Sequence, residues 1–207
     1  VVLGGVNDIK IASPGGANAI WPDFATVYDE ALAAGMSRYM LYHLRDKGVV
    51  VPIARGIYRL ASLPPVADPD LVAVSLKYPR AELCLLSALS FHEITTEIPR
   101  QIFIALPRTS RVPVLKYPPL SVHRFSGEAY SEGIETRLMA DISVKVYCVE
   151  KTIADCFKFR NKIGTDVALD ALKGYMRSGN RDIPKLIDYA RIDRVERIML
   201  PYVEALA

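Results

Sequence analysis

The chain has 207 residues, and 51% of them are hydrophobic, which is enough for one large domain or two small ones with a sizeable core. Its net charge of +3 excludes a uniformly polybasic nucleic-acid coat, so affinity for DNA must come from local clusters of charge. The odd number of cysteines argues against a disulfide framework. No run approaches the ~20 apolar residues that span a bilayer. We therefore expect a soluble cytoplasmic protein with no membrane partner.

The first 20 residues carry little pattern. Gly4-Gly5 and Pro14-Gly15-Gly16 interrupt short apolar pieces, which predicts a loosely docked arm over residues 1–20. The segment Phe24–Ala34 then predicts a helix, for which Asp23 is a suitable N-cap.

The segment from Gly35 to Gly48 predicts a second, short helix with well-defined ends. The hydroxyl of Ser37 can accept a hydrogen bond from a free amide of the first turn, and Gly48 tolerates the left-handed backbone at which helices end. One side of this helix is apolar and consists of Met40, Leu41 and Leu44. The opposite side is basic and aromatic, and it carries Arg38, Tyr39, Tyr42 and Arg45.

After Gly48 the sequence predicts a β-hairpin with Arg55-Gly56 at its tip and a return strand that ends at Leu60. Two helices joined by a tight turn and followed by a hairpin are typical of a winged helix-turn-helix domain, whose second helix enters the major groove. The charges between Gly35 and Leu60 sum to +4, which suits a surface that faces phosphates. The predicted DNA-binding residues are Ser37, Arg38, Tyr39, Tyr42, Arg45, Lys47, Arg55 and Arg59.

Two interpretations of this helix stay open on spacing alone. Leucines inside and charges outside also describe the ordinary surface helix of a globular protein. A basic hairpin is likewise often only a solvated hairpin. DNA binding and a structural helical hairpin are therefore about equally supported by the helix, and the wing-like hairpin shifts the balance toward DNA binding.

Residues 63–69 include Pro64, Pro65 and Pro69, and they predict a linker, because proline interrupts both helices and sheets. We predict an α+β protein in which a winged helix-turn-helix domain over residues 21–62 precedes an α/β domain over residues 70–207. The second domain is expected to hold a small, mostly antiparallel sheet and C-terminal helices. Its strands are predicted at 101–106, 120–125, 135–139 and 143–149, and its helices at 70–77, 81–94, 150–160, 165–177, 183–189 and 195–206.

Catalytic patterns are absent from the sequence. It contains no glycine-rich phosphate loop and no Gly-x-Ser-x-Gly elbow. His92-Glu93 lacks the second histidine that a zinc protease motif requires. The acidic residues near the predicted strands have no metal-ligand spacing. We therefore expect no catalysis, no metal and no cofactor.

The segment Val149–Gly164 predicts an amphipathic helix that packs on the sheet. Lys151 and Asp155 lie one turn apart and can form an ion pair. Ile153, Cys156 and Phe157 share a face, which indicates the side that is buried.

Two blocks of the sequence resemble one family. Ala34–Arg38, Leu44–Gly48 and Arg55–Leu60 resemble the N-terminal winged helix of AbiEi-type antitoxins, which belong to the type IV toxin–antitoxin (abortive infection) systems of bacteria. Glu150–Asp155 and Lys158–Gly164 are similar to the signature of that family's C-terminal domain, in which the matching residues are Glu150, Lys151, Asp155, Lys158 and Arg160. Ser87–Leu89 and Ile102–Pro107 lie where the family has a helix and a strand.

The resemblance implies a regulator that binds double-stranded DNA at repeats in its own promoter and represses transcription. Its C-terminal domain would assist repression and counter a nucleotidyltransferase-like toxin, without a stable complex between the two proteins. The resemblance does not account for residues 1–20. Two alternatives remain from the sequence: a metal-dependent nuclease that a winged helix delivers to DNA, and a winged-helix module that binds other proteins.

Overall fold

The chain forms two compact units, one made of residues 1–77 with 138–143 and the other of residues 78–137 with 144–207. The computed structural model describes residues 11–12, 18–19, 26–27, 35–54, 57–62, 68–112, 115, 117–139 and 142–206. Within the predicted arm, β1 (Ile11–Ala12) and β2 (Asn18–Ala19) pair antiparallel. The rest of the arm, most of the predicted linker and the predicted hairpin tip lie outside the described residues.

Three antiparallel strands and the helix α2 (Arg38–Asp46) pack together in the N-terminal unit. The strand order is β3 (Thr26–Val27), β5 (Ile57–Leu60) and β4 (Val50–Ala54), so the first strand pairs with the last. The helix α2 lies between β3 and β4 in the chain. The amide of Met40 donates to the Ser37 hydroxyl at 3.1 Å, which confirms the predicted N-cap.

The helix predicted over Phe24–Ala34 is wrong at its beginning. Thr26 and Val27 are extended and pair with Tyr58 and Ile57 of β5. Both residues are β-branched, and the stiffness of such side chains favours a strand once a partner strand is available. Residues 28–34 of the prediction lie outside the described part of the chain.

The apolar side of α2 packs on this small sheet. Met36, Leu41 and Val50 are buried together, and Met40, Leu44, Tyr58 and Leu60 pack against them. The helix α3 (Pro69–Lys77) also belongs to this unit. At its start the amide of Leu71 donates to Asp68 Oδ1 at 3.0 Å.

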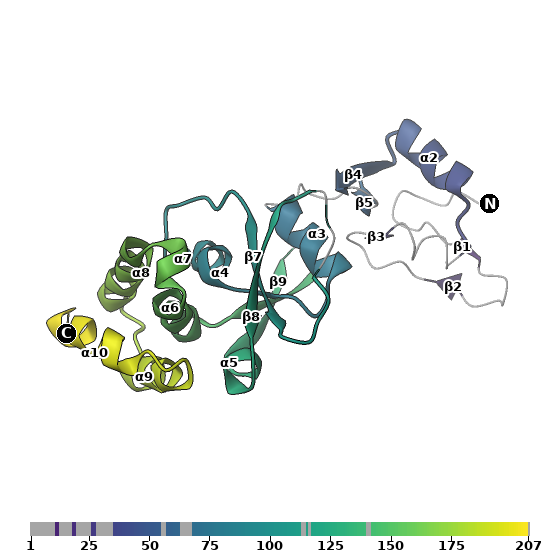
Figure 1. The fold of residues 1–207 in the computed structure, drawn as a ribbon. Coiled ribbons are helices and arrows are strands. Elements are labelled where there is room, and N and C mark those ends of the chain that lie inside the picture. Colours follow the sequence, from purple (N-terminus) through teal and green to yellow (C-terminus); the bar gives the residue numbers. More distant parts are fainter. Residues whose placement is uncertain are drawn as a thin grey trace. The chain divides into compact units, whose positions relative to one another are not determined.

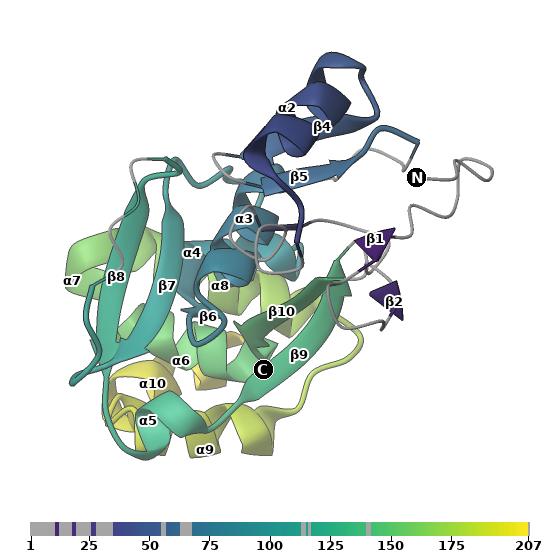
Figure 2. The ribbon, with the colours of Figure 1, turned by 90° about the vertical axis from the view of Figure 1, so that its right-hand side faces the viewer.

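A five-stranded mixed sheet forms one layer of the C-terminal unit (Figure 2). Its strands pair in parallel between β7 and β8 and between β6 and β10, but antiparallel between β6 and β7. In spatial order they are β8 (Leu120–Phe125), β7 (Ile102–Pro107), β6 (Glu82–Leu83), β10 (Ile142–Tyr147) and β9 (Ile134–Met139).

The prediction of one continuous helix over residues 81–94 is wrong at its start, where Glu82 and Leu83 form the strand β6. Leu83 pairs with Ile104 on one side and with Val146 on the other, so its backbone is held extended in the middle of the sheet. The helix begins only at Leu85. These pairings join segments far apart in the sequence, and they override a local helical pattern.

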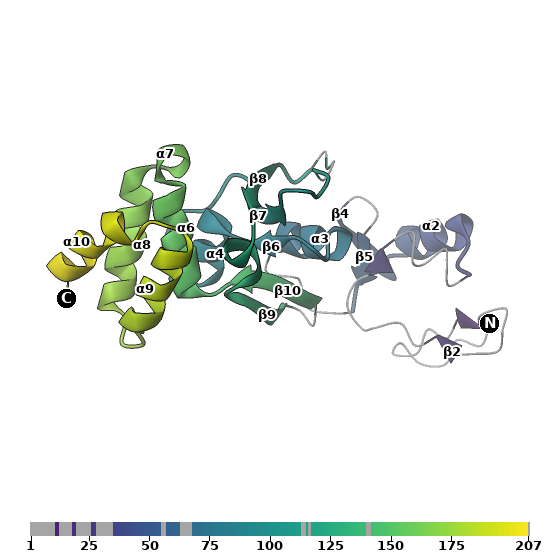
Figure 3. The ribbon, with the colours of Figure 1, turned by 60° about the horizontal axis from the view of Figure 1, so that its bottom comes forward.

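Helices cover one side of the sheet (Figures 1 and 3). The central one, α6, is buried over eight consecutive residues, Glu150–Phe157, rather than along one amphipathic face as the sequence predicts. None of the helices in the described ranges is long and apolar enough to cross a membrane. The helices are α4 (Leu85–Phe91), α5 (Glu128–Ser131), α6 (Val149–Lys158), α7 (Arg160–Ile163), α8 (Thr165–Arg177), α9 (Ile183–Ile192) and α10 (Glu196–Leu206).

Gly133 provides a test of this packing. It has a φ of +77°, and a Cβ atom at this position would lie 2.9 Å from Cβ of Lys151 on α6. We predict that Gly133→Ala lowers the free energy of unfolding by about 1–3 kcal/mol in urea denaturation, because the backbone is strained and the contact too close. Gly179, which has no atom within 4 Å of its added Cβ, is the control, and Gly179→Ala should change stability by less than about 0.5 kcal/mol. Equal effects would contradict the close approach.

Candidate DNA-binding surface and the C-terminal signature

The outward side of α2 is basic and aromatic, as the sequence predicts. Leu41 is only 1% exposed, and its burial fixes which side of the helix faces solvent. Tyr39 is 79% exposed and Tyr42 is 42% exposed on the opposite side. Arg38 and Arg45 are exposed on that side as well. The structure therefore brings the four predicted groove-facing residues onto one solvent-facing surface.

Two side-chain pairs order this surface. The rings of Tyr39 and His43 stack with centroids 5.9 Å apart and planes at 11°. The guanidinium of Arg45 lies 4.9 Å from the centroid of the Tyr42 ring and donates from Nε and Nη2 to Asp46 Oδ1 at 2.9 and 2.7 Å. The hydrogen bond and charge of Asp46 raise the pKa of Arg45. Because both partners are exposed, this ion pair orients the guanidinium but adds little stability.

His43 is a surface residue that the sequence analysis did not select. It lies four residues after Tyr39, and the helical spacing of these two ring residues was the available signal. On α2 it lies beside Tyr39 and extends the aromatic part of the surface by one turn.

The other predicted DNA-binding residues have different surroundings. The hydroxyl of Ser37 serves as the helix cap, and Lys47 is exposed at the end of α2. Arg59 is half-buried, and its Nη1 donates to the carbonyl of Leu60 at 3.2 Å. Arg55 lies outside the described residues. The structure thus places Lys47 next to the surface of α2 and Arg59 on the neighbouring strand β5.

The C-terminal signature surrounds a buried ammonium group. Lys151 is fully buried, and its Nζ donates to Asp155 Oδ1 and, at 3.1 Å, to Asp193 Oδ2. The centroids of the Phe125 and Tyr147 rings lie 5.0 and 4.9 Å from the same nitrogen. The predicted pair of Lys151 and Asp155 is therefore confirmed, but within a larger cluster than the sequence indicates.

Asp193 is the member of this cluster that sequence analysis missed. It follows α9, is fully buried at its side chain, and also accepts from Lys158 Nζ at 2.8 Å. Burial raises the pKa of Asp155, whereas hydrogen bonds from its neighbours hold the pKa of Asp193 below its ordinary value. No local pattern links Asp193 to Lys151, because 42 residues separate them.

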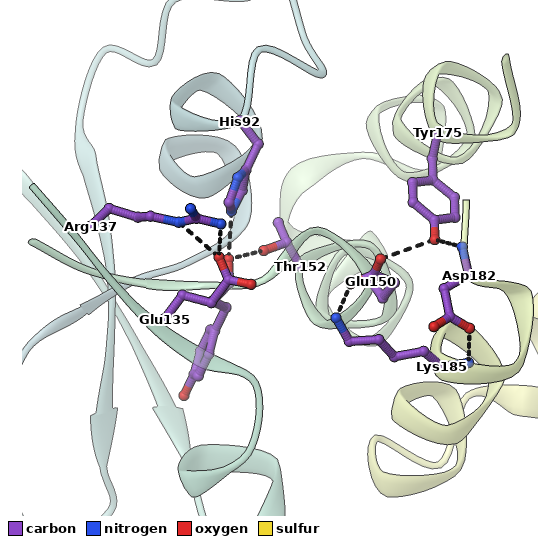
Figure 4. Close-up of polar contacts among 9 residues, drawn as sticks. His92, Glu135, Arg137, Glu150, Thr152, Tyr175, Asp182 and Lys185 are labelled. Carbon is purple, nitrogen blue, oxygen red and sulfur yellow. Dashed lines mark hydrogen bonds and ion pairs between the residues drawn. The ribbon is translucent and has the colours of Figure 1, made fainter. Parts of the chain in front are cut away.

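Glu150, the residue before Lys151 on α6, forms a second polar network (Figure 4). Its carboxylate accepts from the Tyr175 hydroxyl at 3.0 Å and forms an ion pair with Lys185 at 2.9 Å. The Tyr175 oxygen accepts in turn from the amide of Asp182, whose side chain caps α9. Burial acts to raise the pKa of Glu150, but Lys185 and Tyr175 hold it below its ordinary value. Glu150 thus connects α6 to α8 and α9.

The signature residues therefore point mainly inward. Arg160 donates from Nη1 to the carbonyl of Phe157 at 2.8 Å, and Lys158 is the partly exposed member with 29% of its side chain accessible. The contacts of the signature residues fix how the helices pack. Among the described residues, no three His, Cys, Asp or Glu side chains are grouped as metal ligands would be.

Comparison with known proteins finds a family model that matches the segment containing α2. Residues 28–61 match the family model described as "Transcriptional regulator, AbiEi antitoxin". The AbiEi resemblance is confirmed over this segment. It covers α2, β4 and β5, and it amounts to about a sixth of the chain.

A solved structure is also similar in fold to nearly the whole chain. The crystal structure of the RV2827C protein from Mycobacterium tuberculosis has a TM-score of 0.54 and 15% sequence identity, over 94% of this chain and 85% of that chain. At this identity the similarity concerns the fold alone. No curated protein matches the chain.

The buried lysine generates a stability prediction. Lys151→Met should lower the free energy of unfolding by about 3–5 kcal/mol, because it leaves two buried carboxylates without their shared partner. The matched control is Lys173→Met on α8, which removes an exposed ion pair to Asp170 and should change stability by about 0.5 kcal/mol or less. Urea denaturation followed by circular dichroism measures both changes, and similar losses in the two variants would contradict a structural role for Lys151.

Proposed function

We propose that this protein is a DNA-binding transcriptional repressor that acts as an AbiEi-like antitoxin. The observation that carries the proposal is the solvent-facing, basic and aromatic side of α2, within the segment that matches the AbiEi family. A helix of this kind presents guanidinium groups to base edges and phosphates, and its aromatic hydroxyls can bond the backbone of DNA.

The topology of the N-terminal unit supports a winged helix. In such domains a strand, a helix-turn-helix and a two-stranded wing follow one another, and the first strand pairs with the last strand of the wing. The described strands have this order, β3-β5-β4, with α2 immediately before the β4–β5 hairpin. In this assignment α2 is the recognition helix.

Each predicted residue then has a distinct role. Arg38, Tyr39, Tyr42 and Arg45 are proposed to enter the major groove from α2, with His43 beside them. The orientation of Arg45 by Asp46 and Tyr42 suits a residue that reads a base, because a fixed guanidinium discriminates better than a mobile one. Ser37 would position the start of the helix. Lys47, Arg55 and Arg59 are proposed to contact phosphates or the minor groove.

The C-terminal unit is proposed to supply the antitoxin activity. The family resemblance implies a nucleotidyltransferase-like toxin as the functional partner, without a stable complex, and DNA repeats in the promoter as the operator. We propose no catalytic activity for either unit.

Fluorescence anisotropy with DNA from upstream of the protein's own gene tests the assignment. Arg45→Ala should cost about 1–3 kcal/mol in binding and relax specificity at one base pair, because one bidentate contact is lost. Lys47→Ala should weaken binding to all sequences alike and lower the salt slope by about 1. Lys173→Ala in the C-terminal unit is the control and should bind like the unmodified protein.

Three outcomes separate the alternatives. Unchanged affinity in both Arg38→Ala and Arg45→Ala would refute the groove assignment. Cleavage of the same DNA in the presence of Mg²⁺ or Mn²⁺ would favour a nuclease. Absent or salt-insensitive binding would favour a module that recognises other proteins.

A further inference from the structure

A hollow of about 400 Å³ lies in the C-terminal unit, lined by residues of the parallel strands β7 and β8 and the short helix α7. Its polar lining consists of Gln101, Ser121, His123 and Lys162, and its apolar lining includes Phe103 and Ile163. No residue that lines it carries a carboxylate. The volume falls at the lower end of the range for pockets that hold small organic ligands.

His123 is the lining residue whose side chain is most tightly held by its neighbours. It is only 6% exposed, its ring stacks on Phe103 at a centroid distance of 5.7 Å, and Phe159 meets the ring edge-on at 4.9 Å. Its Nε2 is 3.1 Å from the Ser121 hydroxyl, whereas its buried Nδ1 has no hydrogen-bond partner among the described residues. The two aromatic rings and the Ser121 hydroxyl therefore hold the imidazole in place at the wall of the hollow.

Lys162 supplies positive charge at the same place. Its side chain is exposed, and its Nζ lies 5.6 Å from the centroid of the Phe159 ring. Burial and the charge of Lys162 together lower the pKa of His123 to about 4. At neutral pH the hollow therefore offers one cation, one neutral imidazole, a hydroxyl and a primary amide.

We propose that this hollow binds a small phosphorylated ligand. An oxyanion with several acceptor oxygens can accept from the Lys162 ammonium, the Ser121 hydroxyl and the amide of Gln101, while Nε2 of the neutral His123 ring donates to the Ser121 oxygen and holds that hydroxyl in place. The hollow is larger than a single phosphate group requires, so the apolar wall formed by Phe103 and Ile163 can take an attached organic group. None of the residues that line the hollow belongs to α2, and the proposal does not rest on DNA binding.

The test uses the full chain, labelled with ¹³C at histidine and titrated in a buffer free of phosphate. Inorganic phosphate and AMP should each shift the ring signals of His123 saturably, and adenosine should not. Equal affinities for phosphate and AMP would identify free phosphate as sufficient, whereas tighter binding of AMP would identify a nucleotide, and both outcomes support recognition of the phosphate group. No saturable shift with either compound, or adenosine binding as tightly as AMP, would overturn the proposal.

Substitutions locate the binding. Lys162→Gln should weaken binding of phosphate and AMP about tenfold or more, because it removes a charge-assisted hydrogen bond. Lys162 is exposed, and the thermal denaturation midpoint should stay unchanged, which separates loss of binding from loss of folding. Lys173→Gln is the matched control on α8 and should bind like the unmodified protein. Equal affinity in Lys162→Gln and the control would place the binding elsewhere and overturn the assignment.

Discussion

A fully buried ammonium group must be surrounded by compensating charge, because its transfer from water costs several kcal/mol even after the protein relaxes. In the C-terminal unit this requirement joins segments far apart in the chain. Lys151 on α6 contacts Asp155 one turn away, Asp193 after α9 and the rings of Phe125 and Tyr147 on β8 and β10. A shift of α6 relative to the end of α9 would break the ion pair between Lys151 and Asp193. The cluster therefore restricts how the helices can pack on the sheet.

In the N-terminal unit, by contrast, the cationic side chains of α2 lie at the surface rather than in the core. There the apolar side of α2 is buried around Leu41, and the guanidinium groups of Arg38 and Arg45 stay in contact with solvent. Exposed guanidinium groups can contact phosphates and base edges, and the release of counterions from DNA favours such contacts. The two units thus place their cationic side chains differently, since Lys151 is an internal support in one and the exposed arginines of α2 form a proposed recognition surface in the other.

Features set by neighbouring residues could be predicted from the sequence. The cap at Ser37, the orientation of α2 and the pair of Lys151 and Asp155 depend on contacts within one turn of helix, and their spacing shows directly in the sequence. The AbiEi resemblance likewise rests on local blocks, and it is confirmed for residues 28–61.

Features set by distant residues could not be predicted. The strands β3 and β6 are two residues long, and each exists only because a remote strand pairs with it. Asp193 completes the Lys151 cluster from 42 residues away. The hollow beside His123 combines residues from separate elements, so the grouping of its polar side chains becomes evident only in three dimensions.

The most direct test of the regulator account is the affinity of the full chain for its own upstream DNA, measured against unrelated DNA over a range of salt concentrations. The account predicts a preference of about 10³-fold or more for the upstream sequence, and affinity that falls steeply as salt rises, by about 0.9 log units per tenfold change for each phosphate contacted. Equal affinity for both DNAs, together with a salt slope near zero, would contradict it.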